Sequence, residues 1–123
     1  MSFRISSIAS AGDLAKERLV LRADGALDVG AYAIFCCWAS DGDEVSSGDV
    51  PAAYWFEDQK VEKGDLIVLY TKSGTRSSKL SDSGRTSHFF YWGRKATLWV
   101  EGKRPVLANT KPYVFGPLPT PEK

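Results

Sequence analysis

The chain holds a single histidine and two adjacent cysteines, the residue types that acid–base or nucleophilic chemistry would need first. His88 is the natural candidate for a general base, because an unperturbed imidazole changes its charge near neutral pH. However, the chain has no Gly-x-Ser-x-Gly motif, and neither Cys36 nor Cys37 lies in a known catalytic context. We therefore expect a structural or interface role for His88, no catalytic residue and no enzyme.

The cysteines and the histidine also lack the spacing that metal or redox sites require. Two adjacent cysteines and one histidine supply neither a structural zinc site nor a Cys-x-x-Cys redox pair. Neighbouring residues on a strand point to opposite faces of the sheet, so a bond between Cys36 and Cys37 is not expected. We expect both thiols to be reduced and buried.

A short acidic loop follows the cysteines. Its members are Asp41, Asp43, Glu44 and Asp49. The Asp-Gly-Asp start places two carboxylates two residues apart, but the loop lacks the twelve-position ligand spacing and the bidentate Glu of an EF-hand. We expect a solvated loop, with cation binding as the alternative, and we assign no metal and no cofactor to the chain.

A long polar insertion, residues 72–87, has four basic residues, six serines and a single acidic residue. Together with the turn at residues 94–95 it forms a charged arm whose basic members are Lys72, Arg76, Lys79, Arg85, Arg94 and Lys95. Cations and hydroxyl groups are typical of phosphate binding, and Tyr70, Tyr91 or Trp92 would be available to stack on bases. Three interpretations stay open: a mobile solvated hairpin, an arm that docks on protein, and a nucleic-acid site.

Bulky aromatic residues follow one another at residues 54–56 and 89–92. Consecutive rings on a strand point to opposite faces, and a sandwich with one solvated face cannot bury them all. Either the insertion or the tail covers the outer rings, or the rings form an exposed interface patch. The C-terminal segment 110–123 is apolar and holds four of the six prolines, so we expect it to lie against a surface, its own or a neighbour's. The residues expected at a protein interface are Trp55, Tyr91, Trp92, Tyr113 and Phe115.

The elements that must position these residues are predicted to be β-strands. Short β-branched and aromatic segments alternate with Gly, Asp, Ser and Pro, and no stripe of helical period is present. The pattern predicts an all-β sandwich or barrel of about eight short strands. The expected strands are residues 3–8, 17–22, 31–38, 53–57, 66–71, 88–92, 96–101 and 105–107.

Composition limits the class of protein further. With 123 residues, 43% hydrophobic and 25% charged, the chain is expected to form one globular domain rather than a disordered, collagenous or coiled-coil protein. A net charge of +1 excludes a polycation that acts through its overall charge. No signal peptide and no apolar run of membrane-spanning length are recognised, so we expect no membrane partner and a location in the cytoplasm or in a particle assembled inside the cell.

Several stretches together resemble the lamin tail domain over residues 3–108. They are Ile5–Ile8 followed by Glu17–Leu21, then Ala26–Ile34, Val61–Leu69 and the hairpin Thr97–Lys103. Two features depart from that family: Ala23-Asp24 stands where Asn is usual, and the insertion at 72–87 is longer. The resemblance implies a single immunoglobulin-like β-sandwich at residues 1–108, followed by a Pro-rich tail at 109–123. It also implies non-catalytic contact with proteins or nucleic acid.

These observations predict a non-catalytic protein-interaction or structural subunit that docks through an aromatic face and charged loops. Loops of opposite charge on one small domain suit self-association or a place in a larger assembly. The alternative is a nucleic-acid-binding module that uses the basic arm 72–95.

Overall fold

The computed structural model describes residues 2–40, 45 and 48–121, and within these residues the fold is all-β, as predicted. It has ten strands, one 3₁₀ turn at Val29–Ala31 and no α-helix in the described residues. The strands are β1 (Phe3–Ala9), β2 (Arg18–Ala23), β3 (Leu27–Asp28), β4 (Tyr32–Trp38), β5 (Ala52–Trp55), β6 (Lys60–Val61), β7 (Leu66–Tyr70), β8 (Ser77–Leu80), β9 (Thr86–Tyr91) and β10 (Lys103–Asn109).

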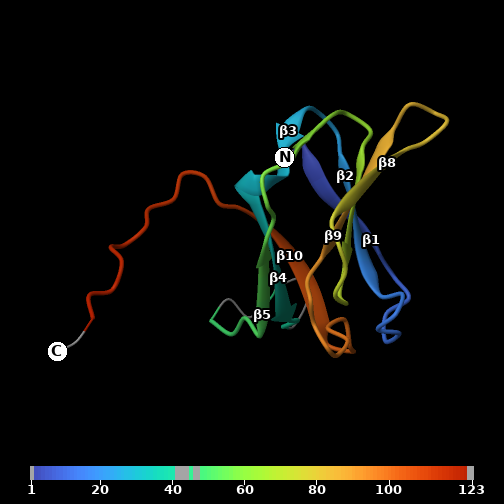
Figure 1. Cartoon of the computed structure of the whole chain (residues 1–123). Helices are drawn as coiled ribbons and strands as arrows, with labels where there is room; N and C mark the ends of the chain where they lie inside the picture. Colours follow the sequence, from blue (N-terminus) through green and yellow to red (C-terminus); the bar gives the residue numbers. More distant parts are fainter. Residues whose placement is uncertain (1, 41–44, 46–47, 122–123) are drawn as a thin grey trace.

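The strands form two larger sheets and one small ribbon. The five-stranded sheet has the order β1-β2-β7-β9-β8, the three-stranded sheet the order β10-β4-β5, and β3 pairs with β6. Among the described strands, β7 and β9 are parallel neighbours, whereas the other pairs are antiparallel. Figure 1 shows the two larger sheets facing each other, as in a β-sandwich, with the C-terminal segment extending away from them.

The core lies between the facing sheets. Strand β2 shows the expected alternation, because Leu19 and Leu21 are fully buried while the residues between them are half-buried. Edge-to-face rings fill the centre, with Phe56 5.1 Å from Phe90 and 6.2 Å from Phe3 between ring centroids. Such pairs add about 0.5–1.5 kcal/mol each beyond the burial of apolar area.

Seven of the eight expected strands are present, and the strand expected at 96–101 is not. Leu98 and Trp99 are nevertheless buried in the core. The Leu98 N–H donates to the Glu17 carboxylate at 2.9 Å, so a side chain takes the place of a strand partner there. An apolar pattern alone does not distinguish a buried strand from a buried coil segment.

The polar insertion differs most from its prediction. Residues 72–87 were expected to be a long loop, but Ser77–Leu80 form strand β8 and pair with β9 at the edge of the larger sheet. The two remaining unpredicted strands, β3 and β6, come from segments where no strand was expected. All three are short, and short strands leave little alternation to recognise in sequence.

Candidate functional site

The basic residues of the charged arm do not gather on one surface. Arg76 turns toward the segment after β5, where its guanidinium donates to Gln59 Oε1 at 3.0 Å and lies 3.5 Å from the Glu57 carboxylate. Its guanidinium carbon also lies 4.8 Å from the centroid of the Phe90 ring. Lys72 instead lies over Tyr70, 5.1 Å from the ring centroid. Arg76 and Lys72, two cations of the arm, therefore contact different parts of the domain.

A different set of residues forms a cationic and aromatic row on the outer face of the five-stranded sheet. Arg18, Tyr70 and Tyr91 are neighbours in register across β2, β7 and β9. The two tyrosine rings are stacked, with centroids 5.2 Å apart and planes within 9°. The Arg18 guanidinium carbon lies 5.9 Å from the Tyr70 centroid, on a sheet face where these side chains are half-buried. Sequence reasoning missed Arg18, because the row depends on strand order.

Two of the five residues expected at a protein interface pack within the domain. Tyr91 stacks on Tyr70, and Trp92 lies between Tyr54 and Trp99, with ring centroids 5.7 and 6.2 Å away. Both Tyr91 and Trp92 are half-buried. The rings of residues 89–92 are thus mostly used for packing.

Trp55, on strand β5, is one of the residues predicted at a protein interface, and it stays exposed in the folded domain. The residue has 49% of its surface accessible. Its indole N–H donates to the Gly30 carbonyl at 2.8 Å, which holds the side chain in place. Tyr113 meets it edge to face, with centroids 5.0 Å apart and an interplanar angle of 90°. The two rings border a hollow of about 360 Å³ at the base of the tail.

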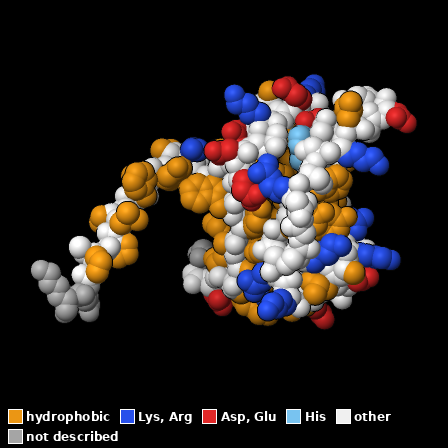
Figure 2. All heavy atoms as spheres, viewed as in Figure 1, with side chains coloured by type: hydrophobic (Ala, Val, Ile, Leu, Met, Phe, Trp, Pro, Cys, Tyr) orange, Lys and Arg blue, Asp and Glu red, His pale blue; other side chains and the backbone are white. Residues whose placement is uncertain are grey.

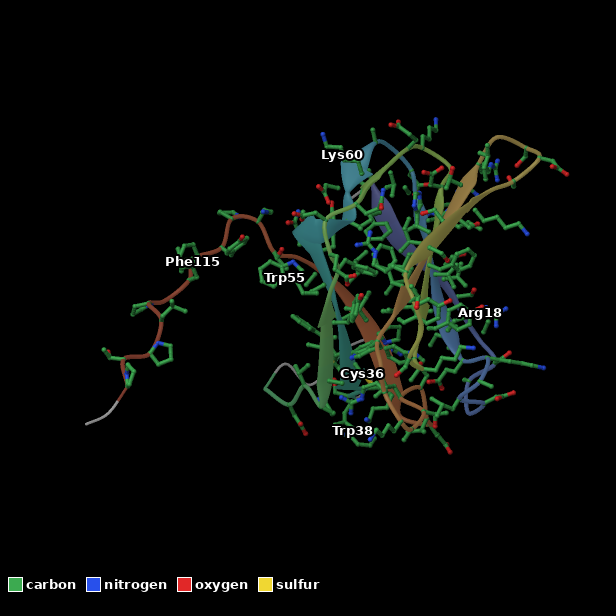
Figure 3. The ribbon with its side chains drawn as sticks, viewed as in Figure 1. Arg18, Cys36, Trp38, Trp55, Lys60 and Phe115 are labelled. Carbon is green, nitrogen blue, oxygen red and sulfur yellow. The ribbon has the colours of Figure 1, made fainter. Side chains whose placement is uncertain are left out.

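Beyond Tyr113 the tail leaves the domain. Val114, Phe115 and Leu118 are 96%, 88% and 92% exposed, so these residues do not lie against their own domain, and the expected contact with a neighbour's surface stays a prediction. Figure 2 shows hydrophobic side chains following the extended tail, and Figure 3 places Phe115 on the tail, beyond Trp55 and outside the sheets. Prolines supply no backbone N–H, so this segment is poorly suited to join a sheet.

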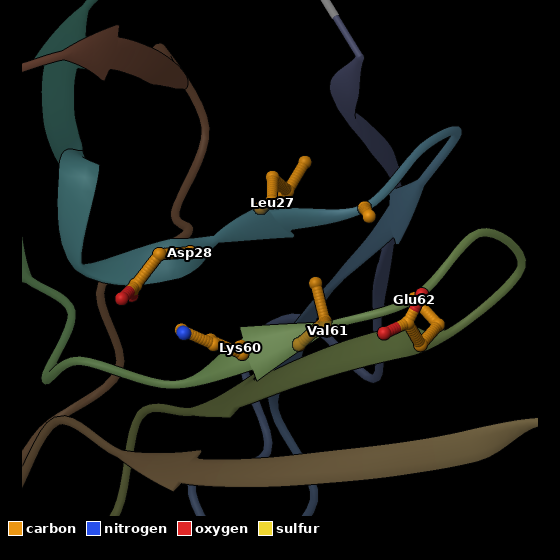
Figure 4. Close-up of a pocket in the computed structure, with 6 residues that line it drawn as sticks. Leu27, Asp28, Lys60, Val61 and Glu62 are labelled. Atoms are coloured by element: carbon orange, nitrogen blue, oxygen red, sulfur yellow. The ribbon is translucent and has the colours of Figure 1, made fainter.

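A second hollow, of about 270 Å³, lies between β3 and β6. Its apolar lining comes from Ala26, Leu27 and Val61, and Lys60 and Glu62 stand beside it. Figure 4 shows Leu27 and Val61 on the two facing strands. This surface was not predicted, since neither strand was recognised.

His88 is buried, and hydrogen bonds link its imidazole to two other polar side chains. Its Nε2 lies 3.1 Å from Asp65 Oδ2, and its Nδ1 lies 3.0 Å from Ser78 Oγ. Asp65 also accepts backbone N–H groups from Glu62 at 3.0 Å and Thr86 at 3.1 Å. Burial by itself would raise the pKa of the Asp65 carboxyl, but these hydrogen bonds and His88 outweigh it and hold the pKa below its usual value. Sequence reasoning singled out His88 and missed both of its partners.

Glu17 is a second buried polar residue that sequence reasoning missed. It is fully buried, and its carboxylate accepts hydrogen bonds from the Thr71 hydroxyl at 2.6 Å, the Leu98 N–H and the Gly12 N–H. A buried carboxylate needs such donors to offset its lost hydration. Glu17 therefore joins the end of β7 to the irregular segment at Leu98, a structural role.

The acidic loop falls largely outside the described residues, which exclude Asp41, Asp43 and Glu44; Asp49 is described and is exposed. In the part of the chain that is described, no three His, Cys, Asp or Glu side chains are grouped so as to hold a metal ion. Cys36 and Cys37 are free and buried, and burial raises the pKa of both thiols.

Comparison with protein-family models and with curated proteins identifies no relative. No protein-family model matches the chain, and no curated protein matches it significantly. Within the described residues, none of the structure is a helix of the length and apolar character needed to cross a membrane. Functional proposals for this chain therefore depend on its own geometry.

Proposed function

We propose that the chain is a lamin-tail-type, immunoglobulin-like docking subunit that associates through its C-terminal tail. The observation that carries the proposal is the exposure of Val114, Phe115 and Leu118 on a segment anchored to the domain at Trp55 and Tyr113. Three large apolar side chains on one short extended segment are costly to leave in water.

A second copy of the chain is the proposed partner. The apolar hollow between β3 and β6 offers a surface on which a tail residue from another copy can be buried. A tail that docks on a different site of a neighbouring copy makes a head-to-tail contact, which leads to rings or filaments. Under this proposal, the domain serves as a repeating unit of an assembly.

The expected affinity follows from the apolar area available. Burying three large apolar side chains contributes about 5–9 kcal/mol at about 1.5–3 kcal/mol each. Association itself costs about 4–15 kcal/mol in lost freedom. The largest apolar gain with the smallest cost leaves about 5 kcal/mol, which corresponds to a Kd of about 0.2 mM. Self-association through these three side chains alone is therefore expected only at about millimolar concentration, and tighter binding requires additional contacts.

Light scattering coupled to size-exclusion chromatography, over a range of protein concentrations, tests the proposal. The full chain should show a mass that rises with concentration, and the variant Phe115→Ser should stay monomeric under the same conditions. Ala26→Asp, which places a charge at the hollow, should have a similar effect. A monomeric full chain at every concentration would contradict self-association, and a separate partner protein would then be sought.

A second candidate function, binding of single-stranded nucleic acid, is supported by the row of Arg18, Tyr70 and Tyr91. Lys72 adds a second cation over the Tyr70 ring. Cations beside aromatic rings on a sheet face are typical of surfaces that bind phosphates and stack bases.

Fluorescence anisotropy with a labelled single-stranded oligonucleotide tests this alternative. Binding should weaken steeply as salt rises, and a double variant with Arg18→Ala and Lys72→Ala should weaken it and reduce the salt slope by about 1.4. Arg76→Ala is the matched control, because Arg76 is occupied by Gln59 and Glu57. Absence of binding at low salt would exclude the nucleic-acid function.

A further inference from the structure

Ser78, His88 and Asp65 form a continuous hydrogen-bonded relay that the docking function does not use. Ser78 Oγ lies 3.0 Å from Nδ1 of the imidazole, and Asp65 Oδ2 lies 3.1 Å from Nε2. Both distances are those of ordinary hydrogen bonds. A hydroxyl, an imidazole and a carboxylate in this order are the parts of an activated serine nucleophile.

The surroundings of Asp65 determine which imidazole nitrogen holds the proton. An ionised carboxylate only accepts hydrogen bonds, and Asp65 already accepts the N–H groups of Glu62 and Thr86. The contact with Asp65 therefore requires a proton on Nε2 of His88. In the neutral imidazole, Nδ1 is then an acceptor that faces the Ser78 hydroxyl, which is the tautomer that a general base needs.

Ser78 is accessible from solvent, whereas its two partners are not. It lies on β8, the exposed edge strand, while His88 and Asp65 are each 6% exposed. Ser78 lines a polar surface hollow of about 250 Å³ together with Gln59, Arg76 and Ser77. The Gln59 amide at this hollow already donates to the Lys60 carbonyl, and the Arg76 guanidinium donates to Gln59 and lies beside Glu57. An oxygen that acquires negative charge would have to bind their remaining N–H groups.

We propose that Ser78 is a nucleophile activated by His88 and oriented through Asp65, and that the hollow takes small activated acyl esters. Ser78 Oγ attacks the ester carbonyl carbon while its proton passes to Nδ1, giving a tetrahedral oxyanion and an imidazolium. Collapse of this intermediate breaks the bond to the leaving alkoxide, which takes the proton from Nδ1. Water then repeats the sequence on acyl-Ser78 and releases the carboxylic acid.

In this reaction Asp65 is a positioning residue, since it touches His88 and not the ester. Its carboxylate holds the imidazole in the required tautomer and stabilises the imidazolium that forms. The reaction is independent of self-association, because it shares no residue with the tail or with the hollow between β3 and β6. It also departs from the sequence-based expectation of a non-catalytic protein, which was made without knowledge of the contacts of His88.

The hydrogen bond between Ser78 and His88 also has a purely structural explanation, and the experiment must distinguish that explanation from activation of a nucleophile. Ser78 and His88 are direct cross-strand partners in β8 and β9, so their hydrogen bond also holds the edge strand in register. A structural bond alone gives Ser78 no unusual reactivity. Reactivity of Ser78 relative to a neighbouring serine therefore distinguishes the two roles.

The first experiment treats the full chain with a fluorophosphonate probe and maps the adduct by mass spectrometry. Labelling is expected on Ser78, is lost in Ser78→Ala and is retained in Ser77→Ala. Ser77 is the matched control, since it lies on the same exposed strand and pairs with Phe89 rather than with the histidine. Absence of labelling at Ser78, or equal labelling of the two serines, would overturn the proposal.

A second experiment tests the role of His88. In His88→Gln the labelling rate should fall at least about 100-fold, in line with the loss of general-base assistance. An unchanged rate in a folded variant overturns the proposal.

Because His88 is buried, a second pair of variants, Ser78→Cys and Ser77→Cys, provides a readout that leaves the imidazole in place. The thiol of Ser78→Cys should react with iodoacetamide at least about 10-fold faster than the thiol of Ser77→Cys, because a thiol beside an imidazole ionises more readily. Equal alkylation rates contradict the proposed activation. Hydrolysis of p-nitrophenyl acetate that depends on Ser78 then measures turnover.

Discussion

The polar insertion at residues 72–87 and the apolar tail at residues 111–121 are placed opposite to what their side chains alone would suggest. The insertion contributes strand β8 to the larger sheet and a serine to the buried His88. The tail, despite Val114, Phe115 and Leu118, extends away from the domain. Hydrophobic character therefore does not decide which of the two segments joins the fold.

The difference in placement between the insertion and the tail follows from the hydrogen-bonding groups of their backbones. Residues 77–80 have N–H and C=O groups that pair with β9, and the Asp65 carboxylate fixes the start of β9 by accepting the Thr86 N–H. Every backbone polar group of a segment needs a partner, either water or protein. The prolines of the tail lack the N–H that a sheet position requires, so the tail keeps its backbone in water, and its apolar side chains are exposed with it.

The largest expected effect comes from removing the carboxylate that anchors the insertion. Asp65→Ala leaves the N–H groups of Glu62 and Thr86 and Nε2 of His88 without their acceptor. We expect a loss of about 3–5 kcal/mol in the free energy of unfolding, measured by urea denaturation with tryptophan fluorescence.

Asp82→Ala is the control for this variant, since Asp82 is exposed in the turn between β8 and β9. It should change the free energy of unfolding by less than about 0.5 kcal/mol. If Asp65→Ala costs less than about 1 kcal/mol, the insertion is held by something other than this carboxylate.

An intermediate effect is expected where the insertion passes over Tyr91. A Cβ at Gly74 would lie 2.3 Å from Cδ1 and Cε1 of the Tyr91 ring, which is itself stacked on Tyr70. Gly74→Ala must displace that stack, and we expect it to cost about 1–3 kcal/mol. Thermal or urea unfolding of the purified variant measures the cost.

Gly116, in the tail, is the matched control for Gly74. A Cβ at Gly116 meets no atom within 4 Å, so Gly116→Ala should be neutral within about 0.5 kcal/mol. Equal costs at the two positions would mean that the tail is packed as closely as the insertion.

The smallest effect is expected from deleting the tail. A chain that ends at Thr110 keeps the hydrogen bond from the Thr110 N–H to the Ala31 carbonyl and loses the edge-to-face contact of Tyr113 with Trp55. A contact of this kind on the surface is worth less than about 1 kcal/mol, so the monomer should unfold at nearly the same urea concentration. A loss above about 2 kcal/mol would show that the tail stabilises its own domain.

The sequence-based prediction worked where local pattern is sufficient. The alternation of Leu19 and Leu21 with half-buried neighbours identifies β2, and the apolar run before the acidic loop identifies β4. It failed at residues 96–101, because Leu98 and Trp99 are apolar in either a strand or a buried coil. The acceptor that holds this coil, Glu17, is 81 positions away from Leu98.

The candidate sites were predictable only in part for the same reason. Trp55, Tyr113 and Phe115 were selected as large apolar residues in unusual places, and these are the ones that the fold leaves accessible. Tyr91 and Trp92 belonged to the same class and were taken up by packing. Residue type indicates what a side chain is able to do, whereas its neighbours decide whether it is free to do it.

By itself, the sequence determined the all-β class, most strand positions and the apolar character of the tail, because each of these depends on residues a few positions apart. The tertiary structure decided that β8 completes the sheet, that β7 and β9 run parallel and that Ser78, His88 and Asp65 meet. These outcomes depend on strand order and register, which are set by the packing of the whole domain and are not encoded within any one segment.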